Sequence, residues 1–113
     1  MQLQLKPLIL PLNYEPFKRD YTNLANNYIL NALKDIDCRI FVFGSRARGT
    51  FQRFSDLDIG IIPGKESVSS IYEIKDYLNY ESEIPFKIDI VDFSTVSEKF
   101  KQQAMQNVIW WKE

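Results

Sequence analysis

Asp56 and Asp58 are separated by a single residue at the start of the run SDLDIGII. Alternate residues of a strand share a face, so the two carboxylates would lie together, with Cα atoms about 6.6 Å apart. Asp89, in the similar run KIDIVDF, would lie about 5 Å to the side if the two runs pair as neighbouring strands. Such close like charges repel, whereas two Mg²⁺ ions about 3.5–4 Å apart fit between carboxylates and clamp a phosphoryl group. The pattern predicts a metal site; the alternative is three solvated aspartates on an exposed sheet face.

The residues before these aspartates have the composition of a phosphate site. Gly44 follows the apolar run RIFVF, where a glycine lets the backbone approach a ligand closely. If residues 45–50 begin a helical turn, free N–H groups and the Ser45 hydroxyl bind an anion, with Arg46 and Arg48 adding positive charge. GSRARG taken alone favours a flexible basic loop. Its place just before the aspartates favours nucleotide phosphates bridged to a metal, although no Walker A motif is present.

The chain has no histidine and one cysteine, Cys38. The absence of histidine excludes His-based catalytic triads, His general bases and His zinc sites. Any metal must then be held mainly by oxygen, which favours Mg²⁺, Mn²⁺ or Ca²⁺. A single cysteine cannot form an intramolecular disulfide. Because Cys38 precedes an apolar run, we expect a small buried hydrophobe.

The length of 113 residues predicts one domain, residues 1–113, and the apolar share of 45% is ordinary for a globular protein. The net charge of −1 argues against a general nucleic-acid binder, which is usually basic. Residues 1–20 are expected to be an extended lead, whose apolar patch is interrupted by Pro7 and Pro11. That patch is too short to span a membrane and lacks a secretion cleavage site, so we expect a cytoplasmic protein.

Apolar periodicity predicts helices that alternate with strands. The expected helices cover residues 22–36, 67–79 and a segment from about residue 95, and the expected strands cover residues 39–43, 56–62, 86–91 and the C-terminal VIWWKE. Thr22 or Asp20 would cap the first helix, and Thr95 with Glu98 matches a capping box for the last. The predicted fold class is α/β (α+β), with helices packed on a small sheet.

The chain resembles the minimal nucleotidyltransferases of the DNA polymerase β superfamily. Their pattern is Gly-Ser-x-Ala-Arg-Gly, five residues, then Ser-Asp-x-Asp, and it stands here at residues 44–49 and 55–58. A third aspartate on a later strand completes the family site, and Asp89 fits that position. Within the superfamily, the chain looks most like small antitoxins encoded beside an all-helical HEPN protein. It departs from them in its proline-rich lead and in Asn107, where relatives often carry glycine.

The resemblance implies a nucleotidyltransferase fold with a small mixed sheet and a catalytic core over residues 40–92. It also implies transfer of a nucleoside monophosphate from an NTP, with AMP from ATP as the expected case, to a hydroxyl with release of pyrophosphate. Asp56 and Asp58 would bind two Mg²⁺ ions, which Mn²⁺ can replace. Asp89 would hold the catalytic metal and accept the proton of the attacking hydroxyl.

The resemblance also assigns the phosphate contacts. Gly44 and Ser45 would hold the β- and γ-phosphates, and Arg48, with Arg46 as the weaker candidate, would neutralise developing charge. Ser55 would orient the chain into Asp56; a plain turn residue at the start of the strand is an equal alternative.

Some residues near these motifs have two readings. We expect Asp92 to be a surface or helix-capping residue, because its strand parity places it opposite Asp89. Lys87 shares the Asp89 face, and its alternatives are a phosphate contact and a solvated side chain, of which the second is favoured. The aromatic residues Tyr14, Phe17, Trp110 and Trp111 are expected in the core or at an interface.

Three functions fit the sequence. The first is an antitoxin that adenylylates a tyrosine of a HEPN partner in a hetero-oligomer, and small chain size favours it because little chain remains for an acceptor-binding domain. The second is a transferase acting on a small-molecule hydroxyl. The third is a non-catalytic module that binds NTP or blocks its partner by docking.

Overall fold

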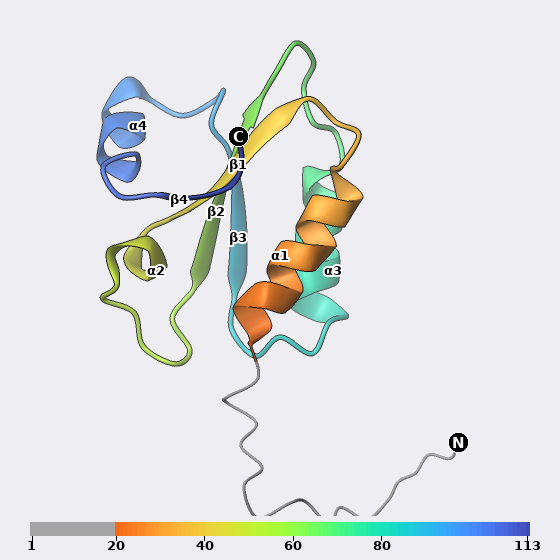
Figure 1. The fold of residues 1–113 in the computed structure, drawn as a ribbon, viewed down its shortest axis with the longest axis vertical. Helices are drawn as coiled ribbons and strands as arrows, with labels where there is room; N and C mark the ends of the chain where they lie inside the picture. Colours follow the sequence, from red (N-terminus) through yellow and green to blue (C-terminus); the bar gives the residue numbers. More distant parts are fainter. Residues whose placement is uncertain (1–19) are drawn as a thin grey trace, which may run out of the picture.

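The computed structural model describes residues 20–113 and contains a four-stranded mixed sheet with helices on both faces (Figure 1). The elements in chain order are α1 (Tyr21–Ala32), β1 (Cys38–Phe43), α2 (Ser45–Arg48), β2 (Leu57–Pro63), α3 (Ile71–Tyr80), β3 (Ile88–Asp92), α4 (Glu98–Ala104) and β4 (Ile109–Lys112). The predicted alternation of helices and strands is confirmed, as is the predicted small mixed sheet. Tyr14, Phe17 and the expected lead lie outside the described residues.

The strand order is β3-β2-β1-β4. Strand β1 runs antiparallel to β2 and β4, and β2 runs parallel to β3. The register pairs Phe43 with Asp58 across β1 and β2, and Asp58 with Asp89 across β2 and β3. The conditional pairing on which the metal-site prediction depends is therefore present.

One face of the sheet packs against α1 and α3, which lie to the right of the strands in Figure 1. Its core is largely aliphatic. The buried members include Ile40, Val42, Leu57, Ile59, Ile61, Ile88 and Ile90 from the strands and Ala25, Ile29, Leu33, Ile71, Ile74 and Leu78 from the helical side. Burying each large side chain contributes about 1.5–3 kcal/mol relative to exposure. We call this side the covered face.

The other face carries a smaller aromatic cluster of Phe41, Phe43 and Phe93 beneath α4. The ring centroids of Phe41 and Phe93 are 4.9 Å apart, and the tilted ring of Trp110 lies 5.2 Å from that of Phe41. Gly60 on β2 makes this packing possible, because a Cβ there would overlap the rings of Phe41 and Phe93. Helices α4 and α2 leave part of this side uncovered, so we call it the open face.

The ends of α1 depend on contacts outside the helix. Asp20 accepts a hydrogen bond from the Asn23 N–H at 2.9 Å, so Asp20 rather than Thr22 is the cap. The helix ends at Ala32, four residues before the expected end. The ammonium of Lys112 donates to the carbonyl oxygens of Leu33 and Ile36, at 3.1 and 2.6 Å, so β4 satisfies groups that a longer helix would have used.

The capping-box prediction for α4 is wrong. Ser97 is the cap, and its hydroxyl accepts from the Phe100 N–H at 3.1 Å. Thr95 instead donates its hydroxyl to the Asp92 carbonyl at 2.9 Å. The chain cannot begin a helix at Thr95 because Asp92 still closes the turn that follows β3, accepting from the Ser94 N–H at 2.8 Å. Asp92 thus caps a turn rather than a helix.

Other expectations need smaller changes. Helix α3 begins at Ile71, later than the expected residue 67. Cys38 is buried, as predicted, and the pKa of its thiol is raised by burial. Trp110 and Trp111 are partly buried against the two clusters. Of the two expected places, the core and an interface, they therefore occupy the core. Over residues 20–113, no helix is both long and apolar enough to cross a membrane.

Candidate active site

The turn between β1 and α2 places backbone directly against Asp58. Gly44 has φ +77°, a conformation that side-chain-bearing residues rarely adopt, and a Cβ on it would overlap the Asp58 carboxylate. The N–H groups of Ala47 and Arg48 both donate to the Gly44 carbonyl at 3.1 Å, which starts α2. The predicted helical turn after Gly44 is therefore confirmed, and it begins beside the candidate metal site.

Arg46 and Arg48 have different surroundings although both lie on α2. The Arg46 guanidinium donates to the Ser55 carbonyl from Nε at 3.2 Å and from Nη2 at 3.0 Å, and to the Arg53 carbonyl at 3.3 Å. It also stacks on Phe86, 4.1 Å from the ring centroid. Burial lowers the pKa of Arg46. In this structure Arg46 holds the loop before β2, and its phosphate contact stays a prediction.

Ser55 takes part in the same loop. Its hydroxyl accepts from the Gln52 N–H at 2.8 Å, while its carbonyl receives the Arg46 guanidinium. These contacts fix the turn that leads into Asp56. They match the turn role that the sequence left open for Ser55. A phosphate contact from this hydroxyl remains a prediction.

The carboxylates of Asp58 and Asp89 are register neighbours on β2 and β3, on the open face. Asp58 is partly buried, and that burial raises its pKa, with further increases from the charges of Asp89 and Asp56. The raised pKa shows that these carboxylates share a field that favours a proton or a cation. Burial is the largest cause of the shift, and the charges of Lys87 and Arg48 act in the opposite direction. The carboxylate pair is therefore a candidate cation site.

A lysine that the sequence analysis missed lies at this site. The Lys75 ammonium on α3 is 3.1 Å from an Asp89 carboxylate oxygen. Among residues 20–113, no three acidic, cysteine or histidine side chains are arranged to hold a metal ion. The donor chemistry fits Mg²⁺, since only oxygen ligands are available at the site and their charges raise the pKa of Asp58. A cation at Asp89 would have to compete with Lys75.

Asn79 also escaped the sequence analysis, and it fixes the strand that carries Asp89. Its side-chain carbonyl accepts from the Ile88 N–H, and its amide group donates to the Ile88 carbonyl, both at 2.8 Å. The spacing of Lys75 and Asn79 on one helical face, four residues apart, was the only signal. It predicts a shared face but not which strand that face meets.

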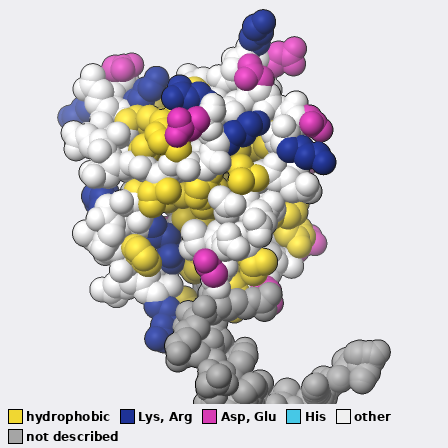
Figure 2. Space-filling view, in the orientation of Figure 1, with side chains coloured by type: hydrophobic (Ala, Val, Ile, Leu, Met, Phe, Trp, Pro, Cys, Tyr) yellow, Lys and Arg dark blue, Asp and Glu magenta, His cyan; other side chains and the backbone are white. Residues whose placement is uncertain are grey.

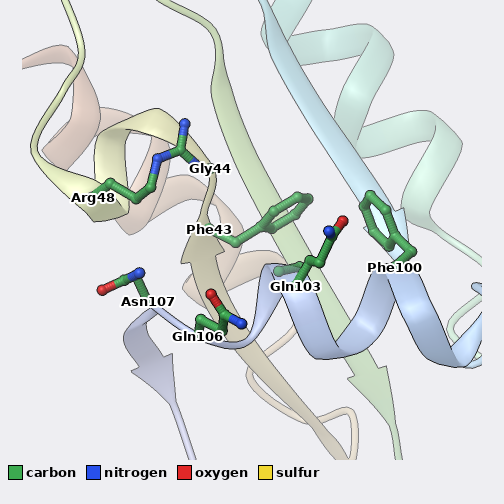
Figure 3. Close-up of a pocket in the computed structure, with 8 residues that line it drawn as sticks. Phe43, Gly44, Arg48, Phe100, Gln103, Gln106 and Asn107 are labelled. Atoms are coloured by element: carbon green, nitrogen blue, oxygen red, sulfur yellow. The ribbon is translucent and has the colours of Figure 1, made fainter.

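A cavity of about 440 Å³ borders Gly44 and lies between α2 and the end of α4 (Figure 3). Its lining residues are Phe43, Gly44, Arg48, Phe100, Gln103, Ala104, Gln106 and Asn107. Arg48 and Gly44 form one wall, and α4 with the segment after it forms the opposite wall (Figure 3). Of the α4 side, the sequence marked Asn107 as a turn residue and Phe100 and Ala104 only as apolar helix positions. The polar run KQQAMQN carried no pattern that would have marked a site.

Apolar groups lie beside the charged ones at this site, because Phe43 and the part-exposed Phe100 line the cavity with Arg48. In the view of Figure 2, hydrophobic side chains reach the surface across the middle of the molecule, with Lys and Arg side chains among them. The site thus combines a pair of neighbouring carboxylates suited to a cation, a glycine turn and an adjacent cavity. Such an arrangement suits a phosphorylated ligand held by its charge at one end and by apolar contacts at the other.

Comparison with curated proteins gives a relative of named activity. The chain is 34% identical over 68 residues to a probable protein adenylyltransferase, MntA, of Haemophilus influenzae. The aligned part covers 58% of this chain and 58% of that protein, so less than two thirds of the relative is matched.

Solved structures share the fold. One, described as a toxin-antitoxin crystal structure with AMP-PNP, has a TM-score of 0.60 and 27% identity, covering 76% of this chain and 71% of that chain. Another is a tri-AMPylated Shewanella oneidensis HEPN toxin in complex with MNT antitoxin, with a TM-score of 0.55 and 22% identity, covering 79% of this chain and 70% of that chain. The predicted nucleotidyltransferase fold is confirmed.

The comparison with family models agrees with the motif and with the fold. The family described as polymerase beta, nucleotidyltransferase, matches residues 27–112, a span that contains every predicted site residue. Because this match covers well over half of the sequence, the chain belongs to the polymerase beta nucleotidyltransferase family.

Proposed function

We propose that this chain is a metal-dependent nucleotidyltransferase that transfers AMP from ATP to a hydroxyl of a HEPN-family toxin, and so acts as its antitoxin. The observation that carries the proposal is the position of Gly44 against Asp58, with Asp89 as the strand neighbour. A phosphate-binding turn and paired carboxylates at one point suit a nucleotide with its metals. The named activity of the relative and the toxin-antitoxin neighbours support the choice of AMP and of the partner.

The proposed residue roles follow the family pattern. Asp56, Asp58 and Asp89 would hold two Mg²⁺ ions, which when bound would supply Lewis-acid charge to the phosphates. Gly44 and Ser45 would receive the β- and γ-phosphates through backbone and hydroxyl groups. Residues 44–58 thus form one continuous segment that reaches from phosphate to carboxylate.

The remaining groups would serve the displacement itself. The acceptor oxygen bonds to the α-phosphorus, the α–β phosphoanhydride bond breaks, and pyrophosphate leaves. Asp89 would take the hydroxyl proton on a carboxylate oxygen. Arg48, which lines the cavity beside Gly44, would balance the charge that develops on the phosphates. Arg46 and Ser55 would act mainly by fixing the loop into Asp56.

The partner supplies the acceptor in this proposal. The two partners would form a hetero-oligomer in the cytoplasm, where ATP and Mg²⁺ are available. Neither a membrane nor direct nucleic-acid binding is part of the function, in line with the net charge of −1.

Intact-mass spectrometry of the HEPN protein encoded nearby tests the proposal. We expect it to gain one or more AMP masses after incubation with this chain, Mg²⁺ and ATP. Asp58→Ala should abolish the gain, because charge stabilisation worth several kcal/mol corresponds to about a thousandfold in rate. Asp35→Ala is the matched control, since Asp35 is exposed and outside the site, and it should leave the gain intact.

Two outcomes would count against this proposal. No mass gain with any NTP, despite a stable complex, would favour an antitoxin that neutralises its partner by docking. Gain on a small-molecule hydroxyl but not on the HEPN protein would favour the small-molecule transferase.

A further inference from the structure

The cavity between α2 and α4 is continuous with the candidate phosphate site. Gly44 and Arg48 line it on one side, and a Cβ on Gly44 would touch the Asp58 carboxylate on its other side. A nucleotide with its phosphates at Gly44 therefore has this cavity directly beside it. The volume of about 440 Å³ falls within the range of about 300–1,000 Å³ typical of ligand pockets.

The wall opposite Arg48 carries three carboxamides, those of Gln103, Gln106 and Asn107 (Figure 3). All three residues are exposed. Within residues 20–113, none of these side chains makes a hydrogen bond to another protein group. A carboxamide offers one acceptor and two donors, so this wall presents unused hydrogen-bonding capacity to anything in the cavity.

An aromatic side chain stands beside these carboxamides. Phe100 is one helical turn before Gln103 on α4, so the two side chains share a face. Its ring packs against Phe43 in a T-shaped arrangement and against Phe93 in a tilted one, with centroids 6.0 and 5.7 Å away, yet 40% of the residue is exposed. The small side chain of Ala104 leaves space next to it. Phe100 is therefore held in place by the aromatic cluster while part of its ring remains open for stacking.

We propose that this cavity binds the base of the nucleotide and selects adenine, with Phe100 as the stacking surface and the Gln103 carboxamide as the reading group. The inference rests on the proposed function, because it requires an NTP whose phosphates lie at Gly44. A carboxamide pairs bidentately with adenine N6 and N7, since it matches one donor and one acceptor. Guanine presents two acceptors, O6 and N7, and so does not match it in the same way.

Arg48 offers the alternative reading group in this cavity, because a guanidinium pairs bidentately with guanine O6 and N7. Its place on the wall that it shares with Gly44 argues against that use. There it would face the phosphates, whose charge attracts a guanidinium more strongly than a neutral base edge does. The carboxamide wall is then left to the base.

Binding measurements by calorimetry with Mg²⁺ separate the base from the phosphates. The probes are AMP-PNP, GMP-PNP and inorganic tripolyphosphate, which has no base. We expect the full chain to bind AMP-PNP more tightly than either other probe. Gln103→Leu should weaken AMP-PNP binding by about tenfold, the lower part of the range for one bidentate base contact, and leave tripolyphosphate binding unchanged.

Two further variants complete the test. Gln102→Leu is the matched control, because Gln102 is an exposed neighbour on α4 that does not line the cavity, and it should change nothing. Phe100→Leu keeps apolar volume but removes the ring face, so both purine analogues should bind more weakly, by about fivefold or more. This second variant keeps the inference testable if Gln103→Leu acts through folding.

The outcomes distinguish failure of the proposed base site from failure of the proposed function. Tripolyphosphate binding as tightly as AMP-PNP would overturn the base site but leave the phosphate site intact. A preference for GMP-PNP would overturn the adenine assignment and favour Arg48 as the reader. If neither nucleotide nor tripolyphosphate binds, the proposed function itself fails.

Discussion

The two faces of the sheet use neighbouring residues of the same strands for different purposes. On the covered face, Leu57 and Ile88 have no exposed surface and pack among aliphatic side chains. On the open face, Asp58 and Asp89 follow them directly in the sequence and stand beside one another. Lys75 forms an ion pair with Asp89, and the charges of Lys87 and Arg48 act on Asp58. No polar or charged residue in the described part of the chain is fully buried. Because successive side chains of a strand point to opposite faces, the core residues and the site residues lie on opposite faces of the same strands.

The difference also concerns the kind of apolar packing. Aliphatic side chains fill the covered face, whereas aromatic rings support the open face around Phe93. Rings are rigid, so they can hold Phe100 at the rim of the cavity without enclosing it. The comparison predicts that substitutions within the two apolar clusters lower stability, whereas substitutions of the polar groups on the open face change ligand binding.

The largest expected effect comes from Leu57→Ala. Leu57 is fully buried in the aliphatic core, so its truncation should lower the free energy of unfolding by about 2–5 kcal/mol. Equilibrium denaturation in urea measures the loss. Ile109→Ala is the control, because Ile109 is 48% exposed and should cost far less. A loss equal to that of the control would show that burial in the aliphatic core is not what stabilises the covered face.

Gly60→Ala tests the packing of the aromatic cluster. The new Cβ would overlap the rings of Phe41 and Phe93, so overpacking should lower the free energy of unfolding by about 1–3 kcal/mol. Near-ultraviolet circular dichroism should show that the rings have moved. Adding Phe93→Leu should recover part of the loss, since the two sites are in contact. Strict additivity of the two changes would contradict the packing explanation.

Asp58→Asn should have the opposite sign from the change at its neighbour Leu57. Burial and the charges of Asp89 and Asp56 raise the pKa of Asp58 from 3.8, so the folded chain binds this proton more tightly than the unfolded chain. Metal-free stability is therefore greatest below the ordinary aspartate value and is lost as the pH rises through the raised pKa. Removing the charge should stabilise the metal-free protein at pH 7 by about 0.5 kcal/mol.

Thermal unfolding across pH 4–8 measures this effect. The Asp58→Asn curve should be flatter than that of the original chain over the acidic range. Asp35→Asn, an exposed aspartate outside the site, serves as the control. A variant that is less stable than the original chain at every pH would show that Asp58 is held by favourable contacts rather than by repulsion.

The smallest effect is expected from Lys75→Met. Lys75 and Asp89 form a partly exposed ion pair, and such pairs contribute about 0.2–1 kcal/mol. A divalent cation would no longer compete with that ammonium, so Mg²⁺ affinity should rise by up to about fivefold. Calorimetric Mg²⁺ titration measures the change, with the exposed Lys34→Met as control. Weaker Mg²⁺ binding would show instead that Lys75 positions Asp89 for the metal.

The strands and their faces could be predicted from the sequence because alternation is a local signal. The runs around Leu57 and Ile88 each show it, and pairing them places Asp58 beside Asp89. Gly44 was also predictable, since a glycine between a strand and a polar segment marks a close backbone approach. Local pattern and family motif agreed at these positions.

The misses arose where a distant residue decides the outcome. The Arg46 guanidinium stacks on Phe86 and binds the Ser55 carbonyl, contacts that no local pattern shows. Lys112 binds the carbonyl oxygens just after α1, although 76 positions separate it from Ile36 in sequence. Lys75 and the α4 carboxamides join the site only because α3 and α4 pack where they do. No local period contains that information, so tertiary contacts override it.

The pairing of Asn79 with Ile88 has a consequence for the sheet as a whole. Strand β3 lies at the edge of the sheet, where unpaired backbone groups invite another chain to add a strand. The Asn79 carboxamide occupies both backbone groups of Ile88, immediately before Asp89. A single side chain therefore imitates a neighbouring strand at the first residue of β3. It protects this edge against aggregation while leaving the Asp89 carboxylate on the open face.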